Sequence, residues 1–390
     1  MEELDDIVGV ATEYFGSIFS SGGSNRMEEC IASVPHKVTD DMREMLSSEY
    51  SAEEIKVALF QMGPTKAPGP DGMNALFYQK FWHIVGNDVV AVVLDFLNSS
   101  IMPPEINYTH IILIPKIKSP ERITDYRPIS LCNVIYKIIS KVLANRLKMI
   151  LPQLISPSQS AFVPGCLITD NVLVAYETLR AMHNRRIGKK GSLALKLDIS
   201  KAYDRVEWGF LKEIMSKLGL PNRWIDRVMC CVTFASFSIR INGKAYGNIC
   251  PSRGLRQGVP LSLYLFLLCV EGFKSLLTRA QDEGRIHRVA ICRRAPCLSH
   301  FLFANDSLLF CRATMRDVQV LTELLQTYAD ASGQCINFDK SSVYFSTNTA
   351  TDLRERIKVD LGVREVDRFE SYLGLPTLVS QAKFQTFFFP

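Results

Sequence analysis

The chain has 390 residues, of which 47% are hydrophobic and 22% are charged, a composition typical of a soluble globular protein with room for two or three domains. Its net charge of +5 is compatible with a nucleic-acid partner but too small to require one. The eleven cysteines form no Cys-x-x-Cys pair, which disfavours a zinc site and favours a reducing, intracellular environment. The acidic start is unlike a signal peptide, and the most apolar run, Leu261–Val270, is too short to span a bilayer. We therefore expect no membrane association.

The first part of the chain, residues 1–54, carries the fewest structural signals. Its apolar residues indicate a short helix that ends before Ser20. Ser51 and Glu54 have the spacing of a capping box, in which each side chain bonds the backbone N–H of the other. This pair predicts a helix that continues to about Met62.

A loop, a strand and a turn are predicted next. The prolines and glycines of Lys66–Gly72 exclude helix and strand, so that Lys66 lies on a rigid loop, either solvated or functional. Ile111–Pro115 is predicted to be a short strand. We interpret Asp125–Ser130 as a turn, because the residue before Pro128 is pushed to extended geometry.

Helical periodicity then predicts an amphipathic helix over Val134–Leu151 and a second helix over Thr169–Met182. The first of these helices carries a predicted basic face made of Lys137, Lys141, Arg146 and Lys148. Such a face is usually solvated, but beside a nucleic-acid site it becomes a track for phosphates.

Strict alternation of leucine with other residues predicts a strand over Leu193–Asp198, with an acid at its end. A helix is expected to start at Ser200 and to reach Leu218. Further helices are predicted over Val259–Thr278 and Val318–Ser332.

His300–Cys311 is predicted to be a β-hairpin, because two apolar runs flank the polar residues Asn305, Asp306 and Ser307. We place its turn at Asn305-Asp306. As a solvated turn residue, Asp306 would need no partner. A second strand-end acid, Asp198, favours another interpretation: carboxylates from two adjacent strands can share the two Mg²⁺ ions used in phosphoryl transfer.

Three segments, Leu195–Asp204 (LKLDISKAYD), Gln257–Ser262 (QGVPLS) and Phe303–Asp306 (FAND), together resemble the reverse transcriptase of LINE-type (non-LTR) retrotransposons, and of plant members most closely. Further segments match the same family in the same order between about residues 55 and 379: Lys66–Gly72, Asp125–Leu131, Ser158–Pro164, Ser332-Gly333, Asn337, Lys340-Ser341 and Tyr372–Pro376.

The resemblance implies an α+β fold, the right-hand polymerase core with fingers and palm, in which helices back an antiparallel palm sheet. We expect residues 1–54 to be an N-terminal extension, 55–190 the fingers, 191–376 the palm with a primer-grip-like segment, and 377–390 a truncated tail. The family's thumb and upstream endonuclease are expected to be missing. The chain is therefore interpreted as a truncated or degenerate copy.

The resemblance also assigns chemistry at matching positions. Asp198 and Asp306 correspond to metal-binding aspartates, and two Mg²⁺ ions are the expected cofactors. Asn305 stands where the family carries a further catalytic aspartate of the hairpin. Lys340 resembles the lysine that protonates the leaving pyrophosphate.

Five residues correspond to nucleotide-binding positions. Arg127 is similar to the arginine that contacts the triphosphate. The alternative interpretation is that it is a structural arginine in a turn. Tyr203 matches the aromatic steric gate beneath the sugar of the incoming nucleotide. The alternative interpretation is that it is a buried aromatic residue of a helix. Gln257 and Gly258 match the segment that positions the template–nucleotide pair, and Lys66 lies on the matching loop.

The sequence departs from the family pattern at Asn305, Val259 and Leu263, where the family has Asp, Asp and Pro. Asn305 lacks a negative charge beside the metal ions, which predicts a loss of roughly 10²–10³ in rate or more. The expected function is RNA-directed DNA polymerisation on an RNA template, a DNA primer and dNTP, impaired in this chain.

An alternative is a catalytically inactive module that binds RNA–DNA hybrid through a retained polymerase fold. A third possibility, an RNA-templated RNA polymerase, is disfavoured by Tyr203, whose bulk should exclude a ribose 2′-hydroxyl. By family, we expect an intracellular, nuclear location.

Overall fold

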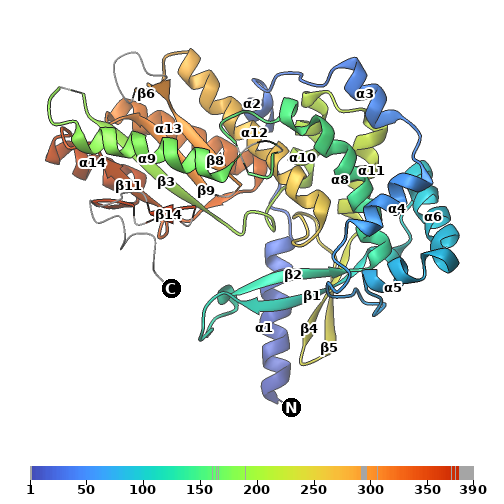
Figure 1. Ribbon diagram of the computed structural model, residues 1–390. Helices are drawn as coiled ribbons and strands as arrows, with labels where there is room; N and C mark the ends of the chain where they lie inside the picture. The colour runs from blue at the N-terminus through green and yellow to red at the C-terminus, as the bar shows by residue number, and fades with distance from the viewer. Residues whose placement is uncertain are drawn as a thin grey trace, which may run out of the picture.

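The computed structural model describes residues 2–159, 161–163, 165, 167–188, 190–290, 297–304, 306–369, 371–373 and 375–376. Asn305 and the expected tail at 377–390 lie outside the described residues. The chain forms two main β-sheets surrounded by helices (Figure 1), which confirms the α+β class.

The bounds of the helices and strands, in chain order, are as follows. The helices are α1 (Glu2–Phe19), α2 (Met27–Ile31), α3 (Asp40–Ser47), α4 (Ala52–Phe60), α5 (Ala75–Lys80), α6 (Trp82–Ser99), α7 (Pro104–Asn107), η1 (Ile123–Asp125), α8 (Val134–Leu154), α9 (Ile168–Asn184), α10 (Trp208–Leu218), α11 (Asn222–Thr233), α12 (Pro260–Asp282), α13 (Met315–Ser332) and α14 (Thr351–Leu361). The strands are β1 (Tyr108–Pro115), β2 (Tyr126–Cys132), β3 (Ser192–Ser200), β4 (Ser236–Ile241), β5 (Lys244–Ile249), β6 (Val289–Ala290), β7 (Cys297–Leu298), β8 (His300–Phe303), β9 (Asp306–Arg312), β10 (Cys335–Ile336), β11 (Ser342–Phe345), β12 (Arg364–Glu365), β13 (Ser371–Tyr372) and β14 (Leu375–Pro376).

The first sheet has the strand order β2-β1-β4-β5, with β1 parallel to β4 and the other pairs antiparallel. This sheet therefore joins residues 108–132, which were expected in the fingers, to residues 236–249, which were expected in the palm. Helix α1 lies across this sheet (Figure 1) and is longer than the short helix predicted. Phe15 and Phe19 of α1 pack with Phe237 and Ile239 in a separate small core.

The interpretation of Asp125–Ser130 as a turn was wrong, because residues from Tyr126 onward form β2. Pro128 is tolerated because β2 is an edge strand. The Ser130 N–H points away from β1 and donates to the Gln257 carbonyl at 3.1 Å. Pro128, two residues earlier, faces the same way, so its missing N–H removes no bond to β1.

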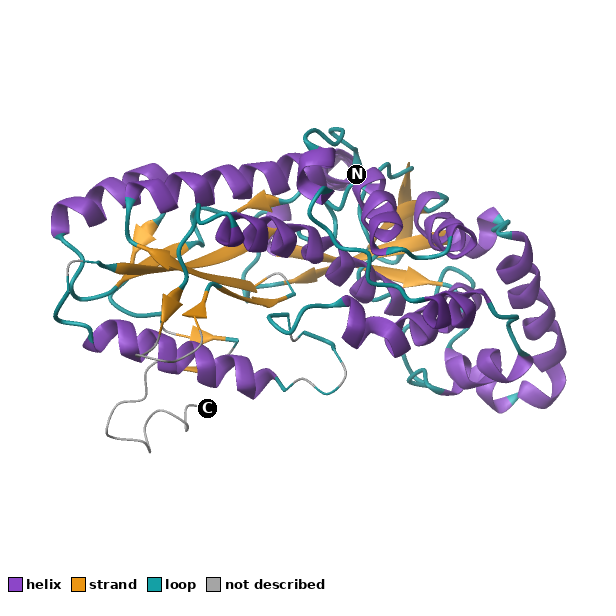
Figure 2. Cartoon of the chain, turned by 90° about the horizontal axis from the view of Figure 1, so that it is seen from above, coloured by secondary structure: helices purple, strands orange, loops and turns teal. Residues whose placement is uncertain are grey.

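The second sheet has the order β12-β11-β3-β9-β8, with β10 also paired to β3. Its two faces have different cores. Leu193, Leu195 and Leu197 of β3 belong to the large core that also contains α12 and α13, whereas Ala194 belongs to the cluster under α9. Figure 2 shows helices along both sides of the strands. The alternation in the sequence therefore identified a strand that is covered on both faces.

Helix α12 forms the centre of the large core. It is long and apolar enough to cross a membrane by length and composition, alone among the helices in the described part of the chain, and 78% of its most apolar window is buried inside the fold. Its burial by other helices accounts for its apolar character.

The helix expected from Ser200 begins only at Trp208. Lys201 has φ +53°, and residues 201–205 form turns. The carbonyls of Tyr203 and Val206 accept from the N–H groups of Leu255 and Gly254, at 2.7 and 2.8 Å. Because a neighbouring segment takes these acceptors, no helix forms there.

The capping box is confirmed, with Ser51 and Glu54 bonded reciprocally at the start of α4. The predicted basic face of α8 is wrong at Arg146, which is only 5% exposed. Its guanidinium donates to Glu54 at 2.8 and 3.0 Å and to the carbonyls of Ser48 and Glu49, each at 2.7 Å. Arg146 thus ties α8 to the start of α4.

We expect Arg146→Ala to lower the free energy of unfolding by about 3 kcal/mol, because it leaves buried carbonyls and a carboxylate without their donor. The control is Arg43→Ala, whose pair with Asp40 is exposed and should cost less than about 1 kcal/mol. Urea unfolding measures both. Equal losses in the two variants would contradict the assignment of Arg146 to the core.

Candidate active site

Asp198 and Asp306 are directly opposite each other on the antiparallel strands β3 and β9. Directly opposed residues place their side chains on the same face of the sheet, with Cα atoms about 4.5–5.5 Å apart. Both side chains are partly exposed. The structure therefore brings together the two predicted acids.

Asp306 lies in a strand and not in the turn where we placed it. Phe303 pairs with Asp306, and Asp306 is the first residue of β9. This difference matters because a residue within a strand has a fixed partner opposite it, whereas a turn residue has none. Asp306 is thus held opposite Asp198 by the register of the sheet.

The electrostatics of this pair favour a bound cation. Burial raises the pKa of Asp306, the charge of Asp198 raises it further, and Lys196 lowers it. Like charges at directly opposed positions are unfavourable unless a cation lies between them, and carboxylate oxygens are the ligands that Mg²⁺ prefers. The pair therefore fits a divalent cation, although the described residues contain no cluster of three or more His, Cys, Asp or Glu side chains suited to a metal. The predicted third position, Asn305, is outside those residues.

The end of β3 is fixed by the segment that contains Lys340. The Asp198 N–H donates to Ser341 Oγ at 3.2 Å, and the Asn337 N–H donates to the Asp198 carbonyl at 2.9 Å. The side chain of Lys340 is exposed on this turn. Tyr372, in the predicted primer-grip segment, is buried. Burial and the nearby charge of Asp306 both raise the pKa of its phenol.

Tyr203 and Gln257 lie on connected segments beside the end of β3. The ring of Tyr203 stacks on Phe266 of α12, with centroids 4.8 Å apart. Gln257 Nε2 donates to Asp204 Oδ1 at 2.9 Å. Gly258 has φ +95°, so glycine is required there for the backbone conformation. An added Cβ would meet only ordinary van der Waals contacts with the protein, so that it is the backbone conformation, not crowding within the fold, that requires glycine here.

Asp204 was not among the predicted site residues. It is 2% exposed, and its Oδ2 atom has no hydrogen-bond partner among the residues that the structure describes. Burial raises the pKa of Asp204 to about 6, although the hydrogen bond from Gln257 and the charge of Lys201 both act to lower it. Its position within the LKLDISKAYD segment is the signal from which it was identifiable.

A cluster of cations lies where β1, β2 and the end of β3 meet. Lys201 Nζ donates to the Tyr126 carbonyl at 3.2 Å and lies 5.6 and 5.7 Å from the ring centres of Tyr14 and Phe15. Burial, together with the neighbouring charges of Lys116 and Arg127, lowers the pKa of Lys201 to about 8. Arg127 is exposed and follows Tyr126 on β2.

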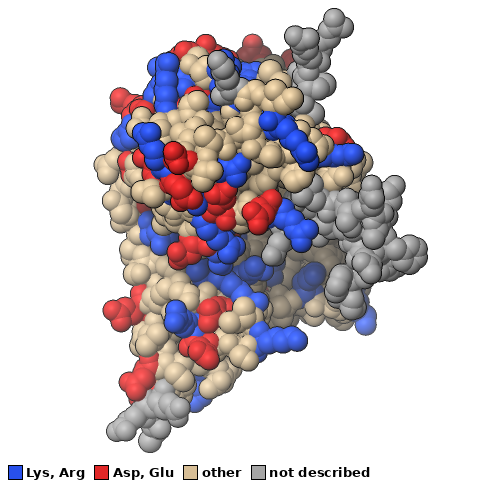
Figure 3. Space-filling model, turned by 90° about the vertical axis from the view of Figure 1, so that its left-hand side faces the viewer, with Lys and Arg blue, Asp and Glu red and all other residues tan. Residues whose placement is uncertain are grey.

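Neither Lys116 nor Lys201 was predicted. Lys116 approaches Arg127 through the pairing of the consecutive strands β1 and β2, and Lys201 approaches it through a tertiary contact with Tyr126 that has no local signal in the sequence. Figure 3 shows Lys and Arg side chains gathered around a hollow on one face of the molecule. Lys66, by contrast, is exposed on its own loop and lies over Gly63. That loop is attached to α8, where Lys137 donates to the Ala67 carbonyl at 3.0 Å.

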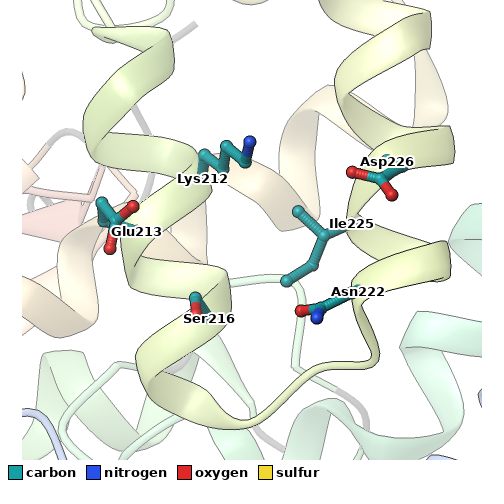
Figure 4. Close-up of a pocket in the computed structure, with 6 residues that line it drawn as sticks. All are labelled: Lys212, Glu213, Ser216, Asn222, Ile225 and Asp226. Carbon is teal, nitrogen blue, oxygen red and sulfur yellow. The ribbon is translucent and has the colours of Figure 1, made fainter.

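A groove of about 290 Å³ lies between α10 and α11 (Figure 4). It is lined by Lys212, Glu213, Ser216, Asn222, Ile225 and Asp226. Except for Ile225, these side chains are exposed and solvated. The groove carries no buried polar group that would bind a ligand, and we assign it no function.

Comparison with known proteins identifies the class that this fold and this carboxylate pair define. Residues 114–376 match the family model described as reverse transcriptase (RNA-dependent DNA polymerase). The match covers more than half of the chain, and the chain therefore belongs to the reverse transcriptase family.

The similar proteins include a transposon protein and Pol polyproteins of retrotransposable elements. The uncharacterized 149 kDa protein of transposon TX1 from Xenopus laevis is 30% identical over 346 residues, 88% of this chain and 26% of that protein. The retrovirus-related Pol polyprotein of a type-2 retrotransposable element from Drosophila melanogaster is 26% identical over 304 residues, 76% of this chain and 27% of that protein. The chain thus spans about a quarter of the length of these two relatives.

An uncharacterized mitochondrial protein of Arabidopsis thaliana is 49% identical over 67 residues, which is 17% of this chain and 55% of that protein. These comparisons confirm the resemblance to non-LTR reverse transcriptases.

The raised pKa of Asp204 predicts a specific pH dependence of stability. At pH values between the ordinary aspartate pKa of 3.8 and the folded-state pKa of about 6, the folded state binds more protons than the unfolded state. The free energy of unfolding should therefore fall as pH rises through this window, by about 2–3 kcal/mol. Urea unfolding from pH 4 to 7 measures this slope.

Asp204→Asn keeps the acceptor for Gln257 but removes the charge, so it should flatten this slope. The exposed Asp226→Asn is the matched control and should retain the wild-type slope. An unchanged slope in Asp204→Asn would show that this carboxyl does not titrate in the window.

Proposed function

We propose that the chain carries the active site of an RNA-directed DNA polymerase that acts on an RNA template, a DNA primer and dNTP. The observation that carries the proposal is the direct opposition of Asp198 and Asp306 on neighbouring strands. In this proposal the first sheet belongs to the fingers, 55–190 together with β4 and β5, and the second sheet belongs to the palm, within 191–376.

Asp198 and Asp306 would hold the Mg²⁺ that this family generally uses. Bound there, the cation would neutralise charge on the phosphate and activate the attacking 3′-hydroxyl. The protein's own contribution is rigidity. The sheet register fixes the two acids. The Asp198 backbone is held at both of its polar groups, because its N–H donates to Ser341 Oγ and its carbonyl accepts from the Asn337 N–H.

The cation cluster would receive the triphosphate. Arg127, Lys116 and Lys201 carry positive charge on one side of the site, and Lys201 is held between aromatic rings and a carbonyl, so that its ammonium is positioned before a ligand arrives. A polyphosphate chain is the kind of anion that such a cluster attracts. Gln257, oriented by Asp204, would lie under the template–nucleotide pair.

Asn305 lowers the catalytic rate in this proposal, because it replaces a negative charge beside the metal with a neutral amide. The same substitution favours the second candidate function, a module that binds RNA–DNA hybrid without extending the primer. In that case binding would depend on the cations around the hollow and would weaken steeply with salt.

Asn305→Asp is expected to raise the rate of Mg²⁺-dependent primer extension by roughly 10²-fold or more, because it restores a metal ligand. Asp306→Asn in the same background is the control and should abolish the gain. The assay uses the full chain with an RNA template, a DNA primer and dNTP. Equal extension rates before and after Asn305→Asp would contradict the assigned role of Asn305.

Should neither form extend a primer, salt-dependent binding of RNA–DNA hybrid would establish the second candidate. A fluorescently labelled hybrid, titrated at several salt concentrations, supplies that measurement. An absence of binding at low salt would exclude both functions.

Tyr203→Ala in the Asn305→Asp background should raise the use of ribonucleotides relative to deoxyribonucleotides at least tenfold, because it removes the ring beside the sugar. Tyr203→Phe keeps the ring that stacks on Phe266 and should retain the discrimination. The ratio of kcat/KM for the two nucleotides is the measurement. An unchanged ratio in Tyr203→Ala would leave Tyr203 as a packing residue.

A further inference from the structure

A short segment, residues 156–159, runs beside the hairpin that carries Asp306, and we call it the strap. Its first residue is anchored to α12. The N–H and Oγ of Ser156 both donate to the carboxylate of Glu271, at 2.9 and 2.8 Å. Glu271 is 2% exposed and also accepts from Lys37 at 2.9 Å. The strap therefore starts from a rigid point in the core.

From this anchor the strap follows β8. The Leu302 N–H donates to the Ser158 carbonyl at 2.8 Å, and Gln159 forms a parallel bridge with Leu302. Ser158 Oγ lies 2.9 Å from His300 Nε2. These bonds add the strap to the open edge of β8, the last strand of the second sheet.

The side chain of Gln159 joins the strap to the turn of the hairpin. It is 1% exposed, and its Oε1 accepts from the N–H groups of Ala161 at 3.0 Å and Ala304 at 3.3 Å. Its Nε2 has no partner among the described residues. A buried amide with an unpaired donor is unfavourable, and an apolar side chain would fill the same space without that cost. The acceptor oxygen is what glutamine contributes here.

The backbone conformation of the turn is one that such a bond stabilises. Ala304 has φ +51°, a left-handed conformation that residues with a Cβ adopt only where the surrounding structure holds them. Ala304 lies two residues before Asp306, which begins β9 opposite Asp198. If the turn relaxes, the first pair of the β3–β9 register is the first to be displaced.

We propose that Gln159 is a positioning residue that holds the turn of the hairpin, so that Asp306 stays opposite Asp198. This role rests on the proposed function, because it matters for catalysis only if these carboxylates act together. The hydrogen bond to Ala304 can nevertheless be tested without catalysis.

The first experiment measures hydrogen exchange of the Ala304 amide in the full chain. Gln159→Met has a similar volume but no acceptor, and it should accelerate this exchange roughly tenfold, the factor that corresponds to the loss of one buried hydrogen bond. Gln159→Glu keeps an acceptor oxygen and should stay within about threefold of the unmodified chain.

Ser158→Ala is the matched control within the strap. It removes the contact with His300 but leaves Gln159 intact, so that it should not accelerate the exchange of Ala304. Unchanged exchange in Gln159→Met, or equal acceleration in Ser158→Ala, would overturn the proposal. The unfolding midpoint of each variant in urea separates loosening of the turn from loss of the fold.

The second experiment uses primer extension in the Asn305→Asp background. Gln159→Met should lower kcat about tenfold or more and change the KM for nucleotide less than threefold, because the acids move while the cation cluster does not. A rise in KM with unchanged kcat would overturn the positioning role. If the Asn305→Asp chain extends no primer, the proposed function fails, and the exchange experiment still decides whether Gln159 holds the turn.

Discussion

Two carboxylates held directly opposite each other on neighbouring strands are the constraint on which the rest of the site depends. Repulsion between Asp198 and Asp306 opposes the pairing of β3 with β9, and burial adds to its cost. The sheet tolerates this arrangement because the apolar rest of β3 is covered on both faces, by α9 on one and by the α12 core on the other. The unfavourable pair is thus stabilised by packing at a distance from it.

Charge is arranged in two zones around this pair. The acids lie at the end of the second sheet, whereas Arg127 lies on β2 of the first sheet and Lys116 directly follows β1. Lys201 lies between the two sheets and contacts Tyr126. A polyphosphate bridged by a cation would complement both zones at once. Helix α1 contributes directly, because the rings of Tyr14 and Phe15 flank Lys201. The N-terminal residues are therefore part of the site's support.

Much of the local structure was predictable from the sequence. Alternating leucines identified β3, two apolar runs identified the hairpin, and the spacing of Ser51 and Glu54 identified the start of α4. These patterns act over a few residues, so that local physics is sufficient. The approach of the two acids followed from placing Asp198 at the end of a strand and Asp306 at the tip of a hairpin, together with the family resemblance.

Other features depend on contacts between distant segments. We interpreted the segment around Pro128 as a turn, because the sequence does not show that this residue lies on an edge strand with its missing N–H directed away from β1. The predicted helix from Ser200 is displaced by Leu255 and Gly254, about 50 residues later, and Arg146 is buried because Glu54 reaches it from another helix. The joining of β4 to β1 likewise has no local signal.

The central claim, that Asp198 and Asp306 form one cation site, is tested most directly by titrating the full chain with Mn²⁺ and following free Mn²⁺ by electron paramagnetic resonance. The account predicts a saturable site that weakens strongly in both Asp198→Asn and Asp306→Asn, whereas the exposed Asp226→Asn leaves it intact. Mn²⁺ binding unaffected by either substitution would contradict the account.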